Sequence, residues 1–177
     1  SIAERYTSAI SKLTGVGKIE VVTGVSSEAG FGVTPTVFFT DWDTACVNPD
    51  LLAEHFGPTT VVITADESKF PEIASTLQGQ LTATIQGTDS DEVSELQSIL
   101  AKRAGRVIWN GFPTGVAVTT AMNHGGPWPA SSTTTTSVGT DAIYRFMRPV
   151  AYQGFAQRNL PKPLQDANPW SVPQKIN

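Results

Sequence analysis

The sequence predicts an α/β protein with a mostly parallel sheet and helices on both faces. Short segments rich in β-branched and apolar residues are typical of buried strands, and we expect strands at residues 18–23, 35–39, 59–64, 81–85 and 106–109. Segments with helical spacing of apolar residues alternate with these strands. Such β-α-β alternation indicates parallel strands, because each crossover helix carries the chain back to the end of the sheet where the previous strand began.

The first two expected helices have clear boundary residues. The first helix opens the chain and ends at Gly15, and its apolar residues are Ile2, Tyr6, Ile10 and Leu13. In the second helix, Asn48 is a favourable N-cap and Pro49 suits the first helical position. Gly57 and Pro58 then stop this short helix.

The third and fourth expected helices each have an apolar stripe. The third ends at Gly79, and its apolar face consists of Phe70, Ile73 and Leu77. Asp89 and Glu92 are spaced as a capping pair at the start of the fourth. The stripe of that helix consists of Val93, Leu96, Ile99 and Leu100, and residues 102–105 close it.

Composition excludes several classes of protein. The 177 residues are one domain's worth of chain, and the net charge of −4, without a basic stripe, argues against nucleic-acid binding. One cysteine excludes an internal disulfide and favours the cytoplasm. No apolar run approaches the roughly 20 residues that span a membrane, and we expect no signal peptide. The chain begins with Ser1 inside a helical pattern, so we expect a cut N-terminus.

A long loop rich in Gly, Pro and Thr follows the last expected strand, over residues 110–139. It leads into an amphipathic segment and a second strand near residues 145–153. Unstructured loops of this length are uncommon inside compact domains and are usually functional. The loop is therefore the first candidate for part of a site.

Glu54 is the one carboxylate that favours a cofactor role. We expect it in the last turn of the short helix after Asn48, where a negative charge opposes the helix dipole at a cost of roughly 0.3–1 kcal/mol. It is either a solvated helix residue or an acceptor for ligand hydroxyl groups, with Phe56 packed beside it. A carboxylate suits ribose hydroxyls because it accepts two hydrogen bonds at once.

Several motifs together resemble the aldehyde dehydrogenase superfamily. Glu54-His-Phe-Gly-Pro58 is followed by Thr-Thr-Val-Val-Ile, and further motifs are Gln80-Leu-Thr-Ala-Thr-Ile85, Ala104-Gly-Arg-Val-Ile-Trp-Asn-Gly-Phe-Pro-Thr-Gly115, His124-Gly-Gly-Pro127 and Thr136-Ser-Val-Gly139. With these, the chain is similar to the NADP-dependent branch that includes 2,5-dioxovalerate (α-ketoglutaric semialdehyde) dehydrogenases. The match is dense over residues 36–153 and loose over residues 1–35.

The resemblance implies a function and a set of site residues. The parent enzyme would oxidise an aldehyde, expected to be a dicarboxylic semialdehyde such as 2,5-dioxovalerate, with NADP or NAD as cofactor. Glu54 would hold the nicotinamide ribose, and Phe56 would pack against that end of the cofactor. The aldehyde tunnel would be bordered by Asn110, Gly111, Phe112, Pro113, Thr114 and His124. Residues 140–153 match a segment used in subunit association, which implies a homo-oligomer, and residues 154–177 form a tail.

The resemblance also implies what this chain lacks. The nucleophilic Cys, the general-base Glu and the dinucleotide-binding domain of the family all lie upstream of the matched region. We therefore expect residues 1–177 to be a single domain, the C-terminal portion of a catalytic domain, with no catalytic residue of its own. The isolated chain would be inactive, and its main partner would be the missing N-terminal half.

Two other functions stay open from the residues alone. The chain could be a non-catalytic binding or assembly module of the same fold. It could also be a cysteine hydrolase, in which Cys46 would be activated by the helix start at Asn48 or by a histidine. Two His and one Cys do not form a ligand cluster, so no metal site is expected.

Overall fold

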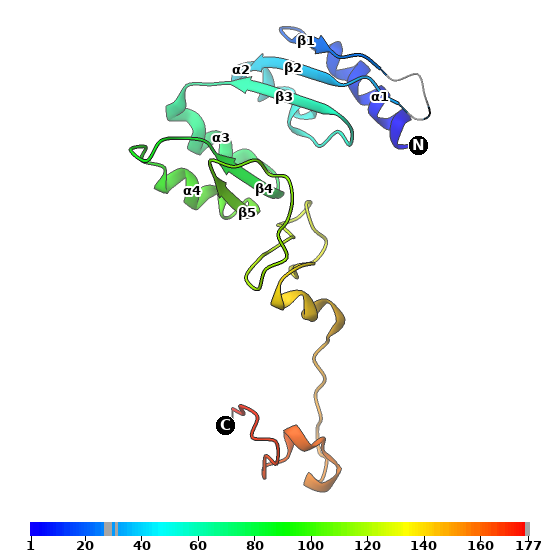
Figure 1. Cartoon of the computed structure of the whole chain (residues 1–177), viewed down its shortest axis with the longest axis vertical. Helices are drawn as coiled ribbons and strands as arrows, with labels where there is room; N and C mark the ends of the chain where they lie inside the picture. Colours follow the sequence, from blue (N-terminus) through cyan, green and yellow to red (C-terminus); the bar gives the residue numbers. More distant parts are fainter. Residues whose placement is uncertain (27–29, 31, 176–177) are drawn as a thin grey trace.

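The computed structural model describes residues 1–26, 30 and 32–175. An α/β body at the N-terminal end is followed by a long irregular loop and then by a C-terminal segment that leads away from the body (Figure 1). The body contains two separately hydrogen-bonded sheets, one of three strands and one of two.

The first sheet has the order β1-β2-β3, where β1 is Glu20–Thr23, β2 is Thr36–Asp41 and β3 is Thr59–Thr64. β1 is antiparallel to β2, and β2 is parallel to β3. Three helical segments accompany this sheet: α1 (Ile2–Thr14), α2 (Trp42–Ala45) and the 3₁₀ segment η1 (Pro49–Leu52).

One face of this sheet forms the first core. Phe38 on β2 is fully buried, and the residues that alternate with it along the strand, Val37 and Phe39, point to the opposite face. Phe38 packs with Leu13 of α1, Ala45 of α2 and Leu51 of η1. Burial of these apolar groups holds the helices on that face, because removing apolar surface from water stabilises by roughly 25 cal/mol per Å².

The second sheet pairs β4 (Gln80–Ile85) with β5 (Ala104–Trp109) in parallel. The 3₁₀ segment η2 (Glu67–Lys69) and the helix α3 (Phe70–Thr76) precede β4, and α4 (Ser94–Leu100) connects the two strands. Ala74, Ile85 and Leu100 form the core of this unit, against which the predicted stripe of the fourth helix packs.

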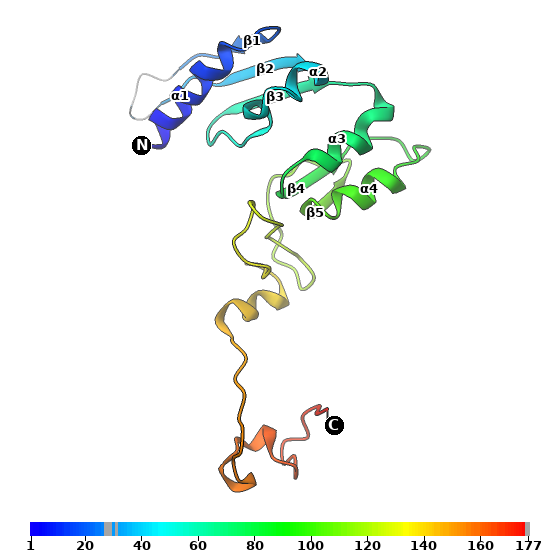
Figure 2. The same ribbon diagram turned by 180° about the vertical axis from the view of Figure 1, so that it is seen from behind.

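The predicted α/β class with parallel strands is confirmed, and all five strands lie close to their expected positions. The helical cover differs in one respect. Figures 1 and 2 view the chain from opposite sides, and in each view α1 to α4 all lie on one and the same side of the strands. Among the described residues, the opposite face of β1–β3 has no helix, and Val22, Phe39 and Val62 are partly exposed there.

The predicted helix ends are only partly right. Asn48 is the N-cap residue of η1 and Pro49 stands at its start, as predicted, but no side-chain capping hydrogen bond forms. The side-chain Nδ2 of Asn48 donates to the carbonyl of Thr44 at 2.8 Å. η1 is a 3₁₀ turn that ends at Leu52, so Glu54 lies beyond it and not in a last helical turn. Asp89 and Glu92 form no capping pair, since α4 begins only at Ser94, without a side-chain cap.

The rest of the chain is largely irregular. Residues 110–139 contain neither helix nor strand, as predicted, and lead into the 3₁₀ segment η3 (Thr140–Phe146). The strand expected near residues 145–153 is not formed, because residues 147–153 run without a partner strand among the described residues. Two further 3₁₀ turns follow, η4 (Gln157–Asn159) and η5 (Lys162–Leu164). None of the described helices is long and apolar enough to cross a membrane.

Candidate functional site

A cavity of about 550 Å³ brings predicted site residues from distant parts of the sequence together. Glu54 comes from the segment after η1, Pro113 and Thr114 from the start of the long loop, and His124 from its middle. Other wall residues belong to the beginning of β4 and to β5, among them Gln80, Leu81, Thr82 and Arg106. The cavity therefore lies between the strand pair β4–β5, the segment after η1 and the long loop.

Glu54 lines this cavity and has no protein partner among the described residues. Glu54 is exposed, and within the described part of the chain it takes part in no hydrogen bond or ion pair. It also lines a second cavity of about 410 Å³, against α1, together with Phe56 and Tyr6. Phe56 does not reach the first cavity and is 70% exposed. Both oxygens of Glu54 are thus available to accept hydrogen bonds from a ligand.

Tyr6 anchors the segment that carries Glu54. It is 4% exposed, and its hydroxyl donates to the carbonyl of Pro58 at 3.1 Å and to that of Thr34 at 2.8 Å. The hydroxyl thereby ties α1 to the residues just before β2 and β3. From the sequence, Tyr6 was expected only as part of an apolar stripe. The one available sign of its role was its hydroxyl group, since a buried tyrosine hydroxyl usually needs a hydrogen-bond partner.

The backbone around His124 is fixed by the returning part of the loop. Its N–H donates to Oγ1 of Thr136 at 2.8 Å, and its carbonyl accepts from the N–H of Ser137 at 3.1 Å. Thr136 is buried, so only part of the 133–136 threonine run is exposed loop. The imidazole of His124 makes no hydrogen bond to any described residue, and it lines the cavity.

Glycines allow the loop to approach the strands closely. A Cβ at Gly105 of β5 would lie within 2.6 Å of the carbonyl carbon of Gly125, and one at Gly79 equally close to that of Pro127. Asn123 Nδ2 donates to the carbonyl of Gly105 at 2.7 Å. The loop around His124 therefore docks backbone against backbone, which larger residues at these glycines would prevent.

Asn110, Gly111 and Phe112 do not line the 550 Å³ cavity. Asn110 has a positive φ of 49°, and its amide bridges both backbone groups of Gly87, donating to the carbonyl and accepting from the N–H at 2.8 Å each. Asn110 thus fastens the end of β5 to the turn after β4. Phe112 is 83% exposed, and its role beside a tunnel stays a prediction.

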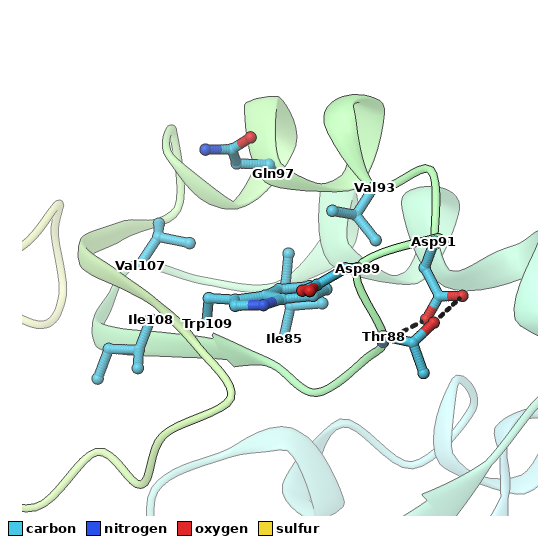
Figure 3. Close-up of a pocket in the computed structure, with 9 residues that line it drawn as sticks. All are labelled: Ile85, Thr88, Asp89, Asp91, Val93, Gln97, Val107, Ile108 and Trp109. Atoms are coloured by element: carbon cyan, nitrogen blue, oxygen red, sulfur yellow. Dashed lines mark hydrogen bonds between the residues drawn. The ribbon is translucent and has the colours of Figure 1, made fainter.

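Another cavity, of about 390 Å³, opens at the carboxyl ends of β4 and β5 (Figure 3). The indole of Trp109 lies in it beside Ile85, its neighbour on the paired strand. Asp91 accepts from the backbone N–H and hydroxyl of Thr88, and these hydrogen bonds lower the pKa of its carboxyl. No group of His, Cys, Asp and Glu among the described residues is arranged to hold a metal.

Cys46 is placed unfavourably for a nucleophile. It lies at the C-terminal end of α2, not at a helix start, and its thiol donates to the carbonyl of Asp43 at 3.3 Å. Cys46 also does not line the cavity that contains His124. The geometry argues against a cysteine hydrolase.

The comparisons with known proteins agree on one class. No family model matches the chain. Its fold is similar to that of Δ-pyrroline-5-carboxylate dehydrogenase from Mycobacterium tuberculosis bound with NAD, with a TM-score of 0.62, 21% identity, and coverage of 88% of this chain and 29% of that one. Other matching structures are also aldehyde dehydrogenases. The fold is therefore that of part of an aldehyde dehydrogenase.

Sequence relatives narrow this class. The chain is 50% identical over 134 residues to alpha-ketoglutaric semialdehyde dehydrogenase from Acinetobacter baylyi, a match that covers 73% of this chain and 26% of the relative. It is 36% identical over 178 residues to alpha-ketoglutaric semialdehyde dehydrogenase 2 from Azospirillum brasilense, covering 98% and 34%. The resemblance inferred from the motifs is confirmed, and the chain spans only about a quarter to a third of the length of these relatives.

Proposed function

We propose that this chain is the C-terminal portion of an NAD(P)-dependent aldehyde dehydrogenase, to which it contributes a nicotinamide-ribose contact and part of the aldehyde tunnel. The observation that carries the proposal is the shared cavity of Glu54, Thr114 and His124. Thr114 and His124 follow Glu54 by 60 and 70 residues in the sequence. The three residues come from three separate motifs that each resemble the family, and all three line the same cavity.

Glu54 fits the role of a cofactor contact. Its carboxylate is exposed and makes no hydrogen bond within the described chain, so it can accept from both hydroxyls of a ribose. The nicotinamide of a bound cofactor supplies the hydride acceptor of the reaction. Phe56, on the neighbouring 410 Å³ cavity with Glu54, is proposed to pack against the same end of the cofactor. The adenosine end would lie outside this chain, which leaves both NADP and NAD as candidates.

The proposed substrate is a dicarboxylic semialdehyde such as 2,5-dioxovalerate. The names of both curated relatives support this substrate class. On the tunnel side we propose Asn110, Gly111 and Phe112 as border residues in addition to Pro113, Thr114 and His124, since the loop that carries them is continuous with the cavity wall.

Catalysis would need groups that this chain does not supply. Oxidation of an aldehyde through a thioester requires a thiolate against the carbonyl, a base and a cofactor within reach. Cys46, the single cysteine, is not on the cavity. We therefore propose that the isolated chain is inactive and that the upstream part of the enzyme contributes the nucleophile.

The assay compares the isolated chain with the full-length protein from its natural reading frame. Both are incubated with 2,5-dioxovalerate and a simple alkyl aldehyde, each with NAD and with NADP, while absorbance of the reduced cofactor is followed. We expect turnover by the full-length protein only. Turnover by the isolated chain that survives Cys46→Ala would contradict the proposal, and an inactive full-length protein would favour a binding or assembly module.

We further propose that residues 140–153 mediate association into a homo-oligomer. Apolar side chains in this stretch are strongly exposed, among them Phe146 (89%), Met147 (58%) and Val150 (54%). Five basic and two acidic residues fall within residues 140–177 of an otherwise acidic chain: Arg145, Arg148, Arg158, Lys162, Lys175, Asp141 and Asp166. Apolar exposure together with opposite charge favours docking on the acidic body of another copy. The single cysteine supports a cytoplasmic location.

A further inference from the structure

Arg106 is a charged residue in the middle of a strand. It lies on β5, next to Val107, which packs into the core with α4. Because side chains alternate along a strand, Arg106 points to the opposite face, where it lines the 550 Å³ cavity. The side chain is half-buried, and a buried charge is costly unless it is hydrogen-bonded.

The guanidinium is bonded to two consecutive carbonyls of the long loop. Nη1 donates to the carbonyl of Gly115 at 2.9 Å, and Nη2 donates to that of Thr114 at 3.3 Å. Nη2 also reaches Oγ1 of Thr82 on β4, at 3.4 Å. The rigid fork of the guanidinium thus joins both strands to residues 114 and 115 of the loop.

Arg106 holds residues 114 and 115 by hydrogen bonds, whereas Gln86, just after β4, donates to the carbonyl of Gly111 at 3.1 Å at the start of the loop. Within the described chain, the hydrogen bonds between residues 112–118 and the strands all come from Arg106. Thr114 and Gly115 are themselves exposed, so burial contributes little to holding them. Pro113, Thr114 and Val116 line the cavity beside the two carbonyls to which Arg106 donates.

We propose that Arg106 is a positioning residue that holds the loop at Thr114 and Gly115 and thereby sets the width of the cavity. If the proposed function holds, Arg106 also determines how easily an aldehyde enters the cavity. It acts through the loop, because its guanidinium donates to backbone carbonyls and not to a reacting atom. Lysine cannot replace it, since a single ammonium lacks the fork that bonds two carbonyls in one plane.

The first test measures the loop itself and needs no activity. Thermolysin cleaves before apolar residues, and its cuts before Val116 and Val118 in the full-length protein are followed by mass spectrometry. Arg106→Gln and Arg106→Lys should each be cut there about tenfold faster than wild type, since charge-assisted hydrogen bonds are lost and local opening becomes easier. Arg103→Gln is the matched control, because Arg103 also donates to a carbonyl, that of Ser75, but does not line this cavity.

Cleavage rates of both Arg106 variants within twofold of the Arg103→Gln rate would overturn the proposal. If Arg106→Gln unfolds, seen as loss of its near-ultraviolet circular dichroism, the cleavage rate of Arg106→Lys decides the test. If wild type turns out inactive toward aldehydes, the proposed function fails while the cleavage rates still decide the role of Arg106.

The second test separates positioning from direct substrate contact. In the full-length enzyme, Arg106→Gln should raise KM about tenfold for a monocarbonyl aldehyde and for a dicarboxylic semialdehyde alike, with the KM of the cofactor unchanged. Added guanidinium should restore part of the loss. A rise in KM confined to the dicarboxylic semialdehyde would show that Arg106 binds the substrate carboxylate and would overturn a purely positioning role.

Discussion

The ring of Tyr6 lies directly against Gly57. A Cβ at position 57 would lie within 2.6 Å of Cε2 of Tyr6, closer than real Cβ atoms approach other groups. Gly57 is therefore required by a contact with α1, and not only because glycine suits the end of a turn. The hydroxyl of Tyr6 donates to the carbonyl of Pro58, so α1 contacts the segment that carries Glu54 at two adjacent residues, Gly57 and Pro58.

Gly57→Ala should destabilise the protein. The added methyl group must displace the buried Tyr6 ring, and overpacking of this kind costs about 1–3 kcal/mol. The measurement is the free energy of unfolding in urea. Gly17→Ala is the matched control, since a Cβ there meets no atom within 4 Å. Equal stability of the two variants would show that Tyr6 moves aside without cost.

Tyr6→Phe should destabilise the protein by about 1–3 kcal/mol, because the carbonyls of Thr34 and Pro58 lose a buried donor. Thermal unfolding measures the loss, with Tyr144→Phe as control, since Tyr144 is 57% exposed. In the full-length enzyme, the variant should also weaken the cofactor contact that we propose for Glu54. An unchanged melting temperature would show that the hydroxyl of Tyr6 does not stabilise the fold.

Acid should weaken the fold in part through Asp41. Hydrogen bonds from the side chain and backbone of Thr44 hold the pKa of the Asp41 carboxyl below its ordinary 3.8. A lowered folded-state pKa gives stability that is present above pH 3.8 and is lost as pH falls through the folded-state value. Asp41→Ala should therefore flatten the acid dependence of the unfolding free energy below pH 4. A slope equal to that of wild type would refute this assignment.

The sequence predicted the core better than the segment ends. Leu13, Ile85 and Leu100 are buried as their spacing indicates, because local periodicity reports which face of an element meets the core. The 3₁₀ geometry of η1 and the turn closed by Asp91 were missed, since several local hydrogen-bonding patterns satisfy the same short polar segment.

The site was only partly predictable for a different reason. Glu54 and His124 were named from motif resemblance, and periodicity alone does not place them in one cavity. The partners of Tyr6 and Arg106 are backbone carbonyls, which any residue supplies, so no pattern in the sequence marks them. A charged residue in a predicted strand and a phenol in an apolar stripe were the available signs.

The most direct test of the central claim is the rate of hydride transfer in the full-length enzyme carrying Glu54→Gln, measured in a single turnover by stopped flow. Glu67→Gln, a substitution at another exposed glutamate that does not line the cavity, is the control. If Glu54 positions the nicotinamide ribose, its variant should slow hydride transfer by about tenfold or more while the overall Kd of the cofactor changes less. A hydride-transfer rate equal to that of wild type and of the Glu67→Gln control would contradict the role of Glu54.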